Sequence, residues 1–190
     1  MRVDPFSTAA QIANIFDSLD IKYALGGSLA SSIIGEPRAT MDADFATRLD
    51  KTRLNEFLEH LTEDYYVSRE SAEEAIDNSD SFNLINTKTS FKVDIFVLGD
   101  GLLDVNQIER RIKVQVPSEN ITEIWATSPE DQILRKLYWF NLSGGVSDRQ
   151  WRDVLSILRV QLENLDIEYL ETTAKATGLD QILEKALSRD

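Results

Sequence analysis

The sequence predicts an α+β protein in which a mixed β-sheet flanked by helices is followed by a helical C-terminal part. Two observations support this prediction. Short alternating or apolar segments recur between helix-like segments up to residue 126, and from Ser128 onward only helical spacing remains. With 190 residues, 42% of them apolar, the chain can build a core. We expect an α/β core over residues 1–126 and a helical subdomain over residues 127–190.

The first segments are expected to run helix, strand, helix, strand. Helical spacing of apolar residues predicts a helix over residues 7–19, with Ser7 as its cap. An apolar strand then stops at two glycines, a short helix starts at Ser28, and a strand with alternating residues follows. These three segments cover residues 21–27, 28–34 and 38–47.

The middle of the chain adds two helices and five strands. Asp50 can cap a helix over residues 51–61, and residues 71–78 begin like a capping box. The expected strands are residues 65–69, two strands within 81–100 joined around Thr87–Thr89, and a pair at 110–116 and 122–127 joined by a turn at Pro117–Asn120.

The last third of the chain carries only helical patterns. Ser128 can cap a helix that runs to Phe140, because Pro129 suits the first helical position. Further helices are expected over residues 147–162, 166–177 and 179–187.

The segment RATMDAD brings two carboxylates onto one face of its strand. In an extended chain Arg38, Thr40, Asp42 and Asp44 share a face. Like charges at short range raise one pKa or need a cation, and carboxylate oxygens are ligands that Mg²⁺ accepts. Asp42 and Asp44 therefore either bind a metal ion or lie solvated on an exposed face.

A third acid interrupts the apolar strand SFKVDIFVL. Asp94 shares a face with Lys92 and Phe96, opposite the apolar face of the strand. It is either a third ligand of the same metal site, or the ion-pair partner of Lys92, or an acid on an edge strand.

Gly26 and Gly27 end a strand immediately before Ser28. Glycine lets another group approach the backbone closely, and free N–H groups at a helix start bind anions. The turn is therefore a phosphate site or an ordinary strand-to-helix turn in which Ser28 is the N-cap.

The order of these features resembles the DNA polymerase beta-like nucleotidyltransferase superfamily. Within it, GGSLASSIIGEPRATMDAD resembles small bacterial AbiEii-like nucleotidyltransferases of toxin–antitoxin and abortive-infection systems, in which an Arg-x-Thr-x-Asp-x-Asp run is typical. SPEDQILRKLYWF followed by SDRQWRDVL resembles their helical Lys and Asp motifs. The resemblance covers Tyr23 to Leu158 and implies a nucleotidyltransferase-like mixed sheet.

The resemblance also implies a reaction, the transfer of a nucleoside monophosphate from an NTP to an acceptor. Asp42, Asp44 and Asp94 would be the catalytic carboxylates and would bind two Mg²⁺ ions with the NTP. Gly27 and Ser28 would hold the triphosphate. Arg38 would contact phosphate or substrate, or pair with an acid of the cluster. The full nucleotide-binding set would be Gly26, Gly27, Ser28, Arg38, Thr40, Lys136 and Asp153.

Helical geometry singles out Lys136 and Asp153. Lys136 lies at the border of an apolar face, where its ammonium is expected to be free, whereas Arg135 points toward solvent. Asp153 lies on a covered side of its helix and needs a partner, for which Lys136 and Arg152 are candidates. Lys136 and Asp153 therefore contact the nucleotide or form a structural ion pair. The neighbouring aromatic residues are assigned to packing, with contact between one of them and the base as the alternative: Tyr138, Trp139 and Trp151.

Composition limits the partners. A net charge of −13 opposes bulk binding to nucleic acid, although a short acceptor end held by Arg110, Arg111 and Lys113 is compatible with it. The chain has no cysteine, which excludes a thiolate zinc site. The start lacks the apolar region of a signal peptide and no apolar run is long enough to span a bilayer, so we expect a cytoplasmic protein without a membrane partner.

Three functional hypotheses follow. The first is a nucleotidyltransferase toxin with tRNA, a protein or a small molecule as its acceptor and an antitoxin as its partner. The second is a non-catalytic nucleotide-binding or antitoxin-like module of the same fold. The third is a nucleotide-sugar transferase that uses Asp-x-Asp, which the upstream glycine turn and the short chain disfavour.

Overall fold

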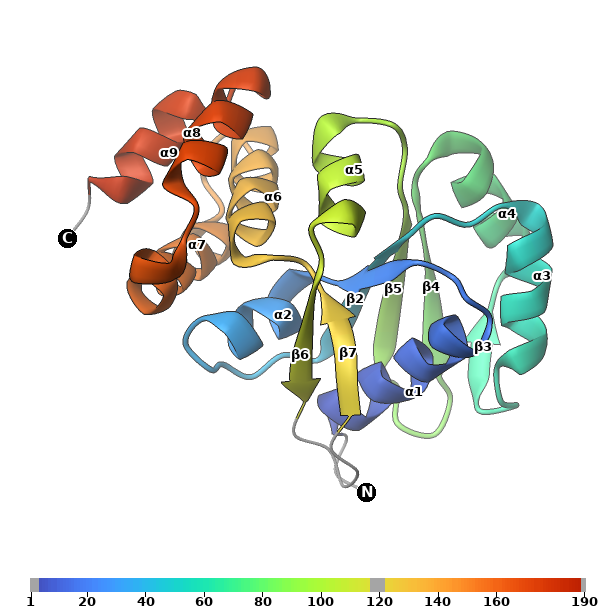
Figure 1. The fold of residues 1–190 in the computed structure, drawn as a ribbon. Coiled ribbons are helices and arrows are strands. Elements are labelled where there is room, and N and C mark those ends of the chain that lie inside the picture. Colours follow the sequence, from blue (N-terminus) through green and yellow to red (C-terminus); the bar gives the residue numbers. More distant parts are fainter. Residues whose placement is uncertain (1–3, 117–121, 189–190) are drawn as a thin grey trace.

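The computed structural model describes residues 4–116 and 122–188 and has a seven-stranded mixed sheet at its centre (Figure 1). The strands are β1 Tyr23–Leu25, β2 Asp42–Thr47, β3 Tyr65–Val67, β4 Ser81–Asn86, β5 Lys92–Val97, β6 Ile112–Val116 and β7 Thr122–Ala126. They lie in the order β3-β4-β5-β2-β1-β7-β6. The pairs β2–β5 and β1–β7 are parallel, and the others are antiparallel. The predicted α+β class with a mixed sheet is confirmed.

Helices surround this sheet and make up the last third of the chain. They are α1 Pro5–Ser18, α2 Gly27–Ile34, α3 Lys51–His60, α4 Arg69–Asn78, α5 Leu102–Glu109, α6 Pro129–Leu142, α7 Asp148–Gln161, α8 Ile167–Ala176 and α9 Asp180–Leu187. A short 3-10 helix, η1 Leu162–Asn164, follows α7. Within the described ranges every helix is too short or too polar to cross a bilayer.

The principal core lies between one face of the sheet and helices α1, α3 and α4. Alternate residues of β2 and β5 point into it, among them Phe45, Val93 and Ile95, which are fully buried. Phe16 of α1 stacks against Tyr23 and Phe57 at ring distances of 5.3 and 4.7 Å. The period-two pattern of β5 therefore sends Asp94 to the other face, as predicted.

A second core joins the C-terminal helices. Ile133, Leu137 and Ile157 are buried in it together with residues of α8 and α9. Ile34 at the end of α2 belongs to the same cluster, so α2 packs between the sheet and the helical part (Figure 1). The division at residues 126 and 127 remains a prediction.

Several predicted boundaries were wrong, and local contacts explain why. The cap of α1 is Asp4, not Ser7, because the Asp4 carboxylate accepts the N–H groups of Phe6 and Ser7. Likewise α4 begins at Arg69 with Ser68 as its cap. Strand β2 begins at Asp42 rather than residue 38, because β1 and β5 pair only with residues 42–47.

Two further differences concern connections. Helix α5 was not predicted, because Leu102–Glu109 has a weak apolar pattern next to two glycines. The predicted turn at Pro117–Asn120 lies outside the described residues.

Candidate active site

The parallel register of β2 and β5 brings two of the predicted carboxylates side by side. Asp44 is the direct partner of Asp94, and Asp42 is the partner of Lys92. Neighbouring strands lie about 4.8 Å apart, so residues in register on one face share the same space. Asp42, Asp44 and Asp94 therefore lie on one patch of the sheet face opposite the principal core.

The glycine turn is pressed against this patch. Gly27 has a φ of +60°, and a Cβ built on it would lie 1.7 Å from Oδ2 of Asp44. The backbone N–H of Ser28 lies close enough to the Asp44 carboxylate to lower its pKa, and the N–H of Gly26 donates to the Asp44 carbonyl at 2.8 Å. Only glycine fits between the carboxylate and the start of α2.

Asp44 is the carboxylate of the patch with the most perturbed charge. Burial has the largest effect, and together with the charges of Asp42 and Asp94 it raises the pKa of Asp44 to about 6. The Lys136 ammonium and the Ser28 N–H act in the opposite direction. A divalent cation beside Asp44 would remove this repulsion.

The carboxylates of the patch are of the kind that binds Mg²⁺, but they do not converge on one point. In the part of the chain that the structure describes, no group of three or more Asp, Glu, His or Cys side chains is arranged to hold a metal ion. Asp94 pairs with Lys92 at 2.8 Å, which is the alternative that the sequence left open, and Asp42 accepts the hydroxyl of Thr40. The carboxylate oxygens of Asp42 and Asp44 fit Mg²⁺ in kind, whereas Asp94 would have to exchange Lys92 for it.

A buried ionic cluster lies beside the turn. Asp153 of α7 accepts two hydrogen bonds from Arg38, at 2.8 and 3.0 Å, and pairs with Lys136 of α6 at 2.9 Å. Arg38 also donates to the hydroxyl of Ser28. Lys136 and Asp153 are both buried, so the expectation of a free Lys136 ammonium was wrong. Of its two predicted candidate partners, Asp153 pairs with Lys136, and it also pairs with Arg38, which was not a candidate.

The cluster has a defined charge state. Burial works to raise the pKa of Asp153, but the hydrogen bonds and charges of Arg38 and Lys136 outweigh it and hold that pKa below its usual value. Burial lowers the pKa of Lys136 against the attraction of Asp153. The ionised Asp153 therefore balances two cations at the entrance to α2.

We expect Asp153→Asn to destabilise the fold by about 3 kcal/mol at pH 7, because it leaves Lys136 buried without a counter-charge. The effect should shrink as the pH falls through the depressed pKa of Asp153, since a protonated Asp153 resembles Asn. Urea unfolding at several pH values measures it. Glu36→Gln, which breaks an exposed pair with Arg159, is the matched control and should cost less than about 1 kcal/mol. Equal losses in both variants would contradict the prediction.

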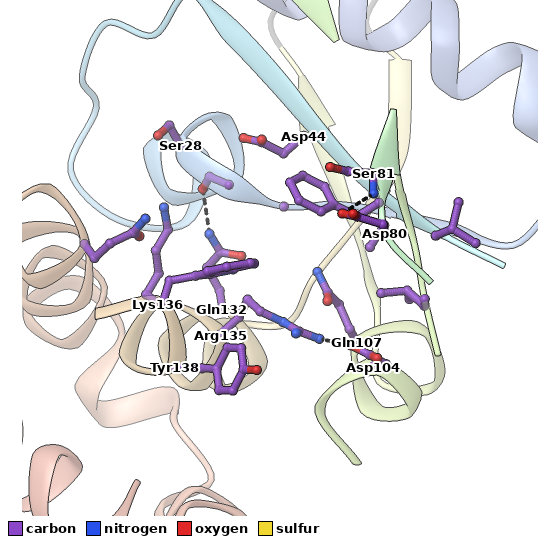
Figure 2. Close-up of a pocket in the computed structure, with 18 of the residues that line it drawn as sticks. Ser28, Asp44, Asp80, Ser81, Asp104, Gln107, Gln132, Arg135, Lys136 and Tyr138 are labelled. Atoms are coloured by element: carbon purple, nitrogen blue, oxygen red, sulfur yellow. Dashed lines mark hydrogen bonds and ion pairs between the residues drawn. The ribbon is translucent and has the colours of Figure 1, made fainter. Parts of the chain in front are cut away.

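A pocket of about 470 Å³ opens from the turn and runs between the sheet and helices α5 and α6. Figure 2 shows Ser28, Lys136 and Gln132 at one side of it and Asp80 and Ser81 at another. Its lining joins Gly26, Gly27 and Asp44 to residues of α5, α6 and α7. The glycine turn and one carboxylate of the patch, that of Asp44, therefore line a cavity large enough for part of a nucleotide, whereas Asp42 and Asp94 are not part of its lining.

Arg135 and Trp139 were assigned wrongly from the sequence. Arg135 does not point to open solvent but lines the pocket and pairs with Asp104 of the unpredicted helix α5. Trp139 is not a core residue, because it is 42% exposed and lines the same pocket. Trp151 does pack, with its ring 5.1 Å from that of Phe140.

The three cations that were proposed to bind an acceptor each contact other residues of the protein. Arg110 stacks on Tyr169 at 3.6 Å and contacts Asp131 and Glu130. Arg111 and Lys113 both lie over the ring of Trp125. These contacts give them structural roles, and their expected contact with an acceptor has no support from the geometry.

Two buried glutamines at the pocket were not predicted. Gln132 donates to the carbonyl of Gly27 at 2.6 Å, and Gln107 donates to Thr127 at 3.1 Å. The spacing of Gln132 four places before Lys136, on the same face of α6, was a usable signal. Gln107 lies on α5 and had none.

The fold is that of the nucleotidyltransferases. Solved structures of that fold resemble the chain along most of its length. An antigenic nucleotidyltransferase-like protein from Paracoccidioides brasiliensis is 18% identical, with 98% of this chain and 94% of that chain covered and a TM-score of 0.58. The antibiotic-resistance factor ANT(2'')-Ia is 15% identical, with 95% and 94% covered and a TM-score of 0.57. The structure of ANT(2'')-Ia in complex with adenylyl-2''-tobramycin is 16% identical, with 90% of this chain and 95% of that chain covered and a TM-score of 0.54.

The particular family follows from the sequence match. The chain matches the family described as "Nucleotidyl transferase AbiEii toxin, Type IV TA system" over residues 13–187 and belongs to it. No curated protein sequence matches the chain. The resemblance stated from the sequence is therefore confirmed at the level of the family.

Proposed function

We propose that this protein is a Mg²⁺-dependent nucleotidyltransferase that transfers a nucleoside monophosphate from an NTP to an acceptor. The observation that carries the proposal is the contact between Gly27 and Asp44, with Asp94 in register beside Asp44. It joins a glycine turn of the kind that binds anions to a carboxylate patch, and the turn and Asp44 line the pocket. Phosphoryl-type transfers need this combination, because they depend on placement and charge neutralisation.

Each element of the site has a role in the proposed reaction. Asp42, Asp44 and Asp94 would hold two Mg²⁺ ions, which when bound supply the charge that favours the attacking oxygen and the leaving pyrophosphate. Gly26, Gly27 and Ser28 would hold the triphosphate at the start of α2. Lys136 and Arg38 lie next to that turn and add positive charge, with Asp153 fixing their positions. Thr40 would orient Asp42 through its hydrogen bond.

The chemistry balances without a covalent enzyme intermediate. A nucleophilic oxygen of the acceptor forms a bond to the α-phosphorus, the bond from that phosphorus to the β-phosphate oxygen breaks, and pyrophosphate leaves with one proton released. Asp94 is the carboxylate of the patch nearest to β4. After its ion pair with Lys92 has broken, it would orient the acceptor. The family description supports the proposal that the protein is a toxin whose effect is counteracted by an antitoxin.

The decisive experiment uses each NTP labelled at the α-phosphate, with Mg²⁺ and either total tRNA, cell extract or small hydroxyl-bearing antibiotics. We expect label to move to one of these acceptors with the parent protein and not with Asp42→Asn. Nucleotide binding without transfer to any acceptor would favour the non-catalytic module. Equal transfer by Asp42→Asn would show that the activity comes from elsewhere.

We also propose that Trp139 contacts the nucleobase. It lies one turn after Lys136 on α6, it lines the pocket, and it is 42% exposed. Trp139→Leu should weaken NTP binding about tenfold, because base stacking is worth about 1–3 kcal/mol. It should also remove most of the tryptophan fluorescence change on binding.

A fluorescence titration measures both effects of Trp139→Leu. Leu142→Ala is the control, because Leu142 is an exposed apolar residue of the same helix. An unchanged affinity in Trp139→Leu would place the base elsewhere in the pocket.

A further inference from the structure

The peptide unit between Gly27 and Ser28 is held from two opposite sides. Its carbonyl accepts a hydrogen bond from Nε2 of Gln132 at 2.6 Å and another from the hydroxyl of Ser31 at 2.9 Å. On the other side, its N–H lies beside the Asp44 carboxylate, which is pressed against Gly27. A trans peptide is planar with its C=O and N–H pointing in opposite directions, so a contact that fixes the carbonyl also aims the N–H.

Gln132 is placed to exert this control. Gln132 is 1% exposed, and its Nε2 also donates to Ser31 Oγ at 2.9 Å. One amide group therefore binds both the carbonyl of Gly27 and the side chain of Ser31. Its Oε1 is buried and has no hydrogen-bond partner among the residues that the structure describes. An unpaired buried acceptor destabilises a protein, and an apolar side chain of the same size would avoid it. An amide at this position is therefore best explained by what its Nε2 does.

The direction of the Ser28 N–H matters because it lies beside an anion, the Asp44 carboxylate. A phosphate oxygen is the same kind of acceptor, and a donor that the fold already orients costs a ligand less ordering free energy. Gly27 itself cannot supply that orientation, since glycine populates several backbone conformations freely.

We propose that Gln132 is a positioning residue that holds the Gly27–Ser28 peptide with its N–H aimed at the triphosphate. The proposal rests on the proposed function, because it assumes that a triphosphate occupies the turn. Gln132 acts on the phosphate tail through the backbone and touches neither the base nor the reacting atoms. Its loss should therefore affect ligands that carry a triphosphate and spare those that do not.

The test compares Gln132→Met with Gln161→Met. Gln161 also donates through its Nε2 to a backbone carbonyl of α2, that of Ile34 at 2.7 Å, but this carbonyl lies at the other end of the helix and Gln161 does not line the pocket. Calorimetric titration in Mg²⁺ uses inorganic tripolyphosphate, the NTP that the parent binds, and the matching nucleoside monophosphate. We expect Gln132→Met to bind tripolyphosphate and NTP about tenfold more weakly, with the monophosphate changed less than twofold. Gln161→Met should bind all three within twofold of the parent.

Ser31→Ala gives a second route to the same carbonyl. It should weaken tripolyphosphate binding about threefold, and its effect should shrink in combination with Gln132→Met, because both side chains act on one group. The KM for NTP should rise in Gln132→Met by more than kcat falls. If Gln132→Met does not fold, Ser31→Ala carries the same comparison.

The outcomes separate this proposal from the proposed function. A parent that binds neither tripolyphosphate nor any NTP would contradict the proposed function. A parent that binds both, with Gln132→Met unchanged, would overturn only the role of Gln132. Equal weakening by the two glutamine variants, or an equal loss for the monophosphate, would also overturn it, because general packing would then explain the effect.

Discussion

Asp44→Asn should abolish nucleotidyl transfer and at the same time make the metal-free protein more stable. We expect transfer to fall at least about 100-fold, equal to about 2.7 kcal/mol of transition-state stabilisation, because the variant loses a carboxylate that would neutralise and hold Mg²⁺. Without metal, Asp44 is destabilised by burial and by Asp42 and Asp94, which raise its pKa to about 6.

The gain in stability has a defined sign and size. A carboxyl group whose pKa is raised on folding costs stability at pH values where it is ionised, about 1.4 kcal/mol for each unit of pKa. The neutral amide keeps an acceptor for the Ser28 N–H without the repulsion. The free energy of unfolding of Asp44→Asn at pH 7.5 in EDTA should therefore rise by about 1 kcal/mol or more.

Urea unfolding and the labelled transfer assay measure the two effects on the same preparation. Asp100→Asn is the matched control, because Asp100 is an exposed acid with its side chain 97% accessible. It should leave both quantities unchanged. A destabilised Asp44→Asn would mean that the Asp44 charge is already balanced in the metal-free protein, which would contradict the electrostatics described for the patch.

Gly27→Ala should be among the most damaging single-methyl additions in the chain. The new Cβ would fall 1.7 Å from Oδ2 of Asp44, and the backbone φ of +60° disfavours any L side chain. Because both effects act together, we expect the free energy of unfolding to fall by about 3 kcal/mol or more. We also expect no measurable NTP binding. The turn would have to move away from β2 to admit the methyl group.

Gly178→Ala separates the cost of the backbone conformation from the cost of the clash with Asp44. Gly178 has a φ of +70° with no atom within 4 Å of an added Cβ, so this variant should lose only about 1 kcal/mol from backbone strain. The double variant Gly27→Ala/Asp44→Gly should recover most of the remaining loss in stability but no activity. Similar losses for Gly27→Ala and Gly178→Ala would show that Asp44 does not press on the turn. Thermal and urea unfolding of the four proteins provide the comparison.

Much of the site was predictable because it depends on local spacing. Alternation along a strand sent Asp94 to the face opposite Val93 and Ile95, and two glycines before Ser28 predicted a helix start open to an anion. Arg38 and Thr40 show the limit of that logic. Alternation put them on the strand of Asp42, but a strand exists only where a neighbour pairs with it, and β5 begins opposite Asp42.

Helix α6 shows the same limit for surface and core. Apolar spacing correctly gave this helix an apolar face, on which Ile133 and Leu137 are buried, yet it assigned Arg135 to solvent and Trp139 to packing. Both line the pocket, because α5 and the sheet face lie opposite that side of α6. A helical pattern reports which faces are apolar, and it does not report what stands across from a polar face.

The amino-acid sequence by itself therefore determined the family, the α+β class, and the residue types of a glycine turn and a carboxylate patch. Those properties follow from spacing within one strand or one turn of helix. Only the tertiary structure decided that Asp44 touches Gly27, that Asp94 stands beside Asp44 while Lys92 holds it, and that Arg38, Lys136 and Asp153 form one cluster. These facts depend on strand register and helix packing between distant segments, which no local pattern encodes.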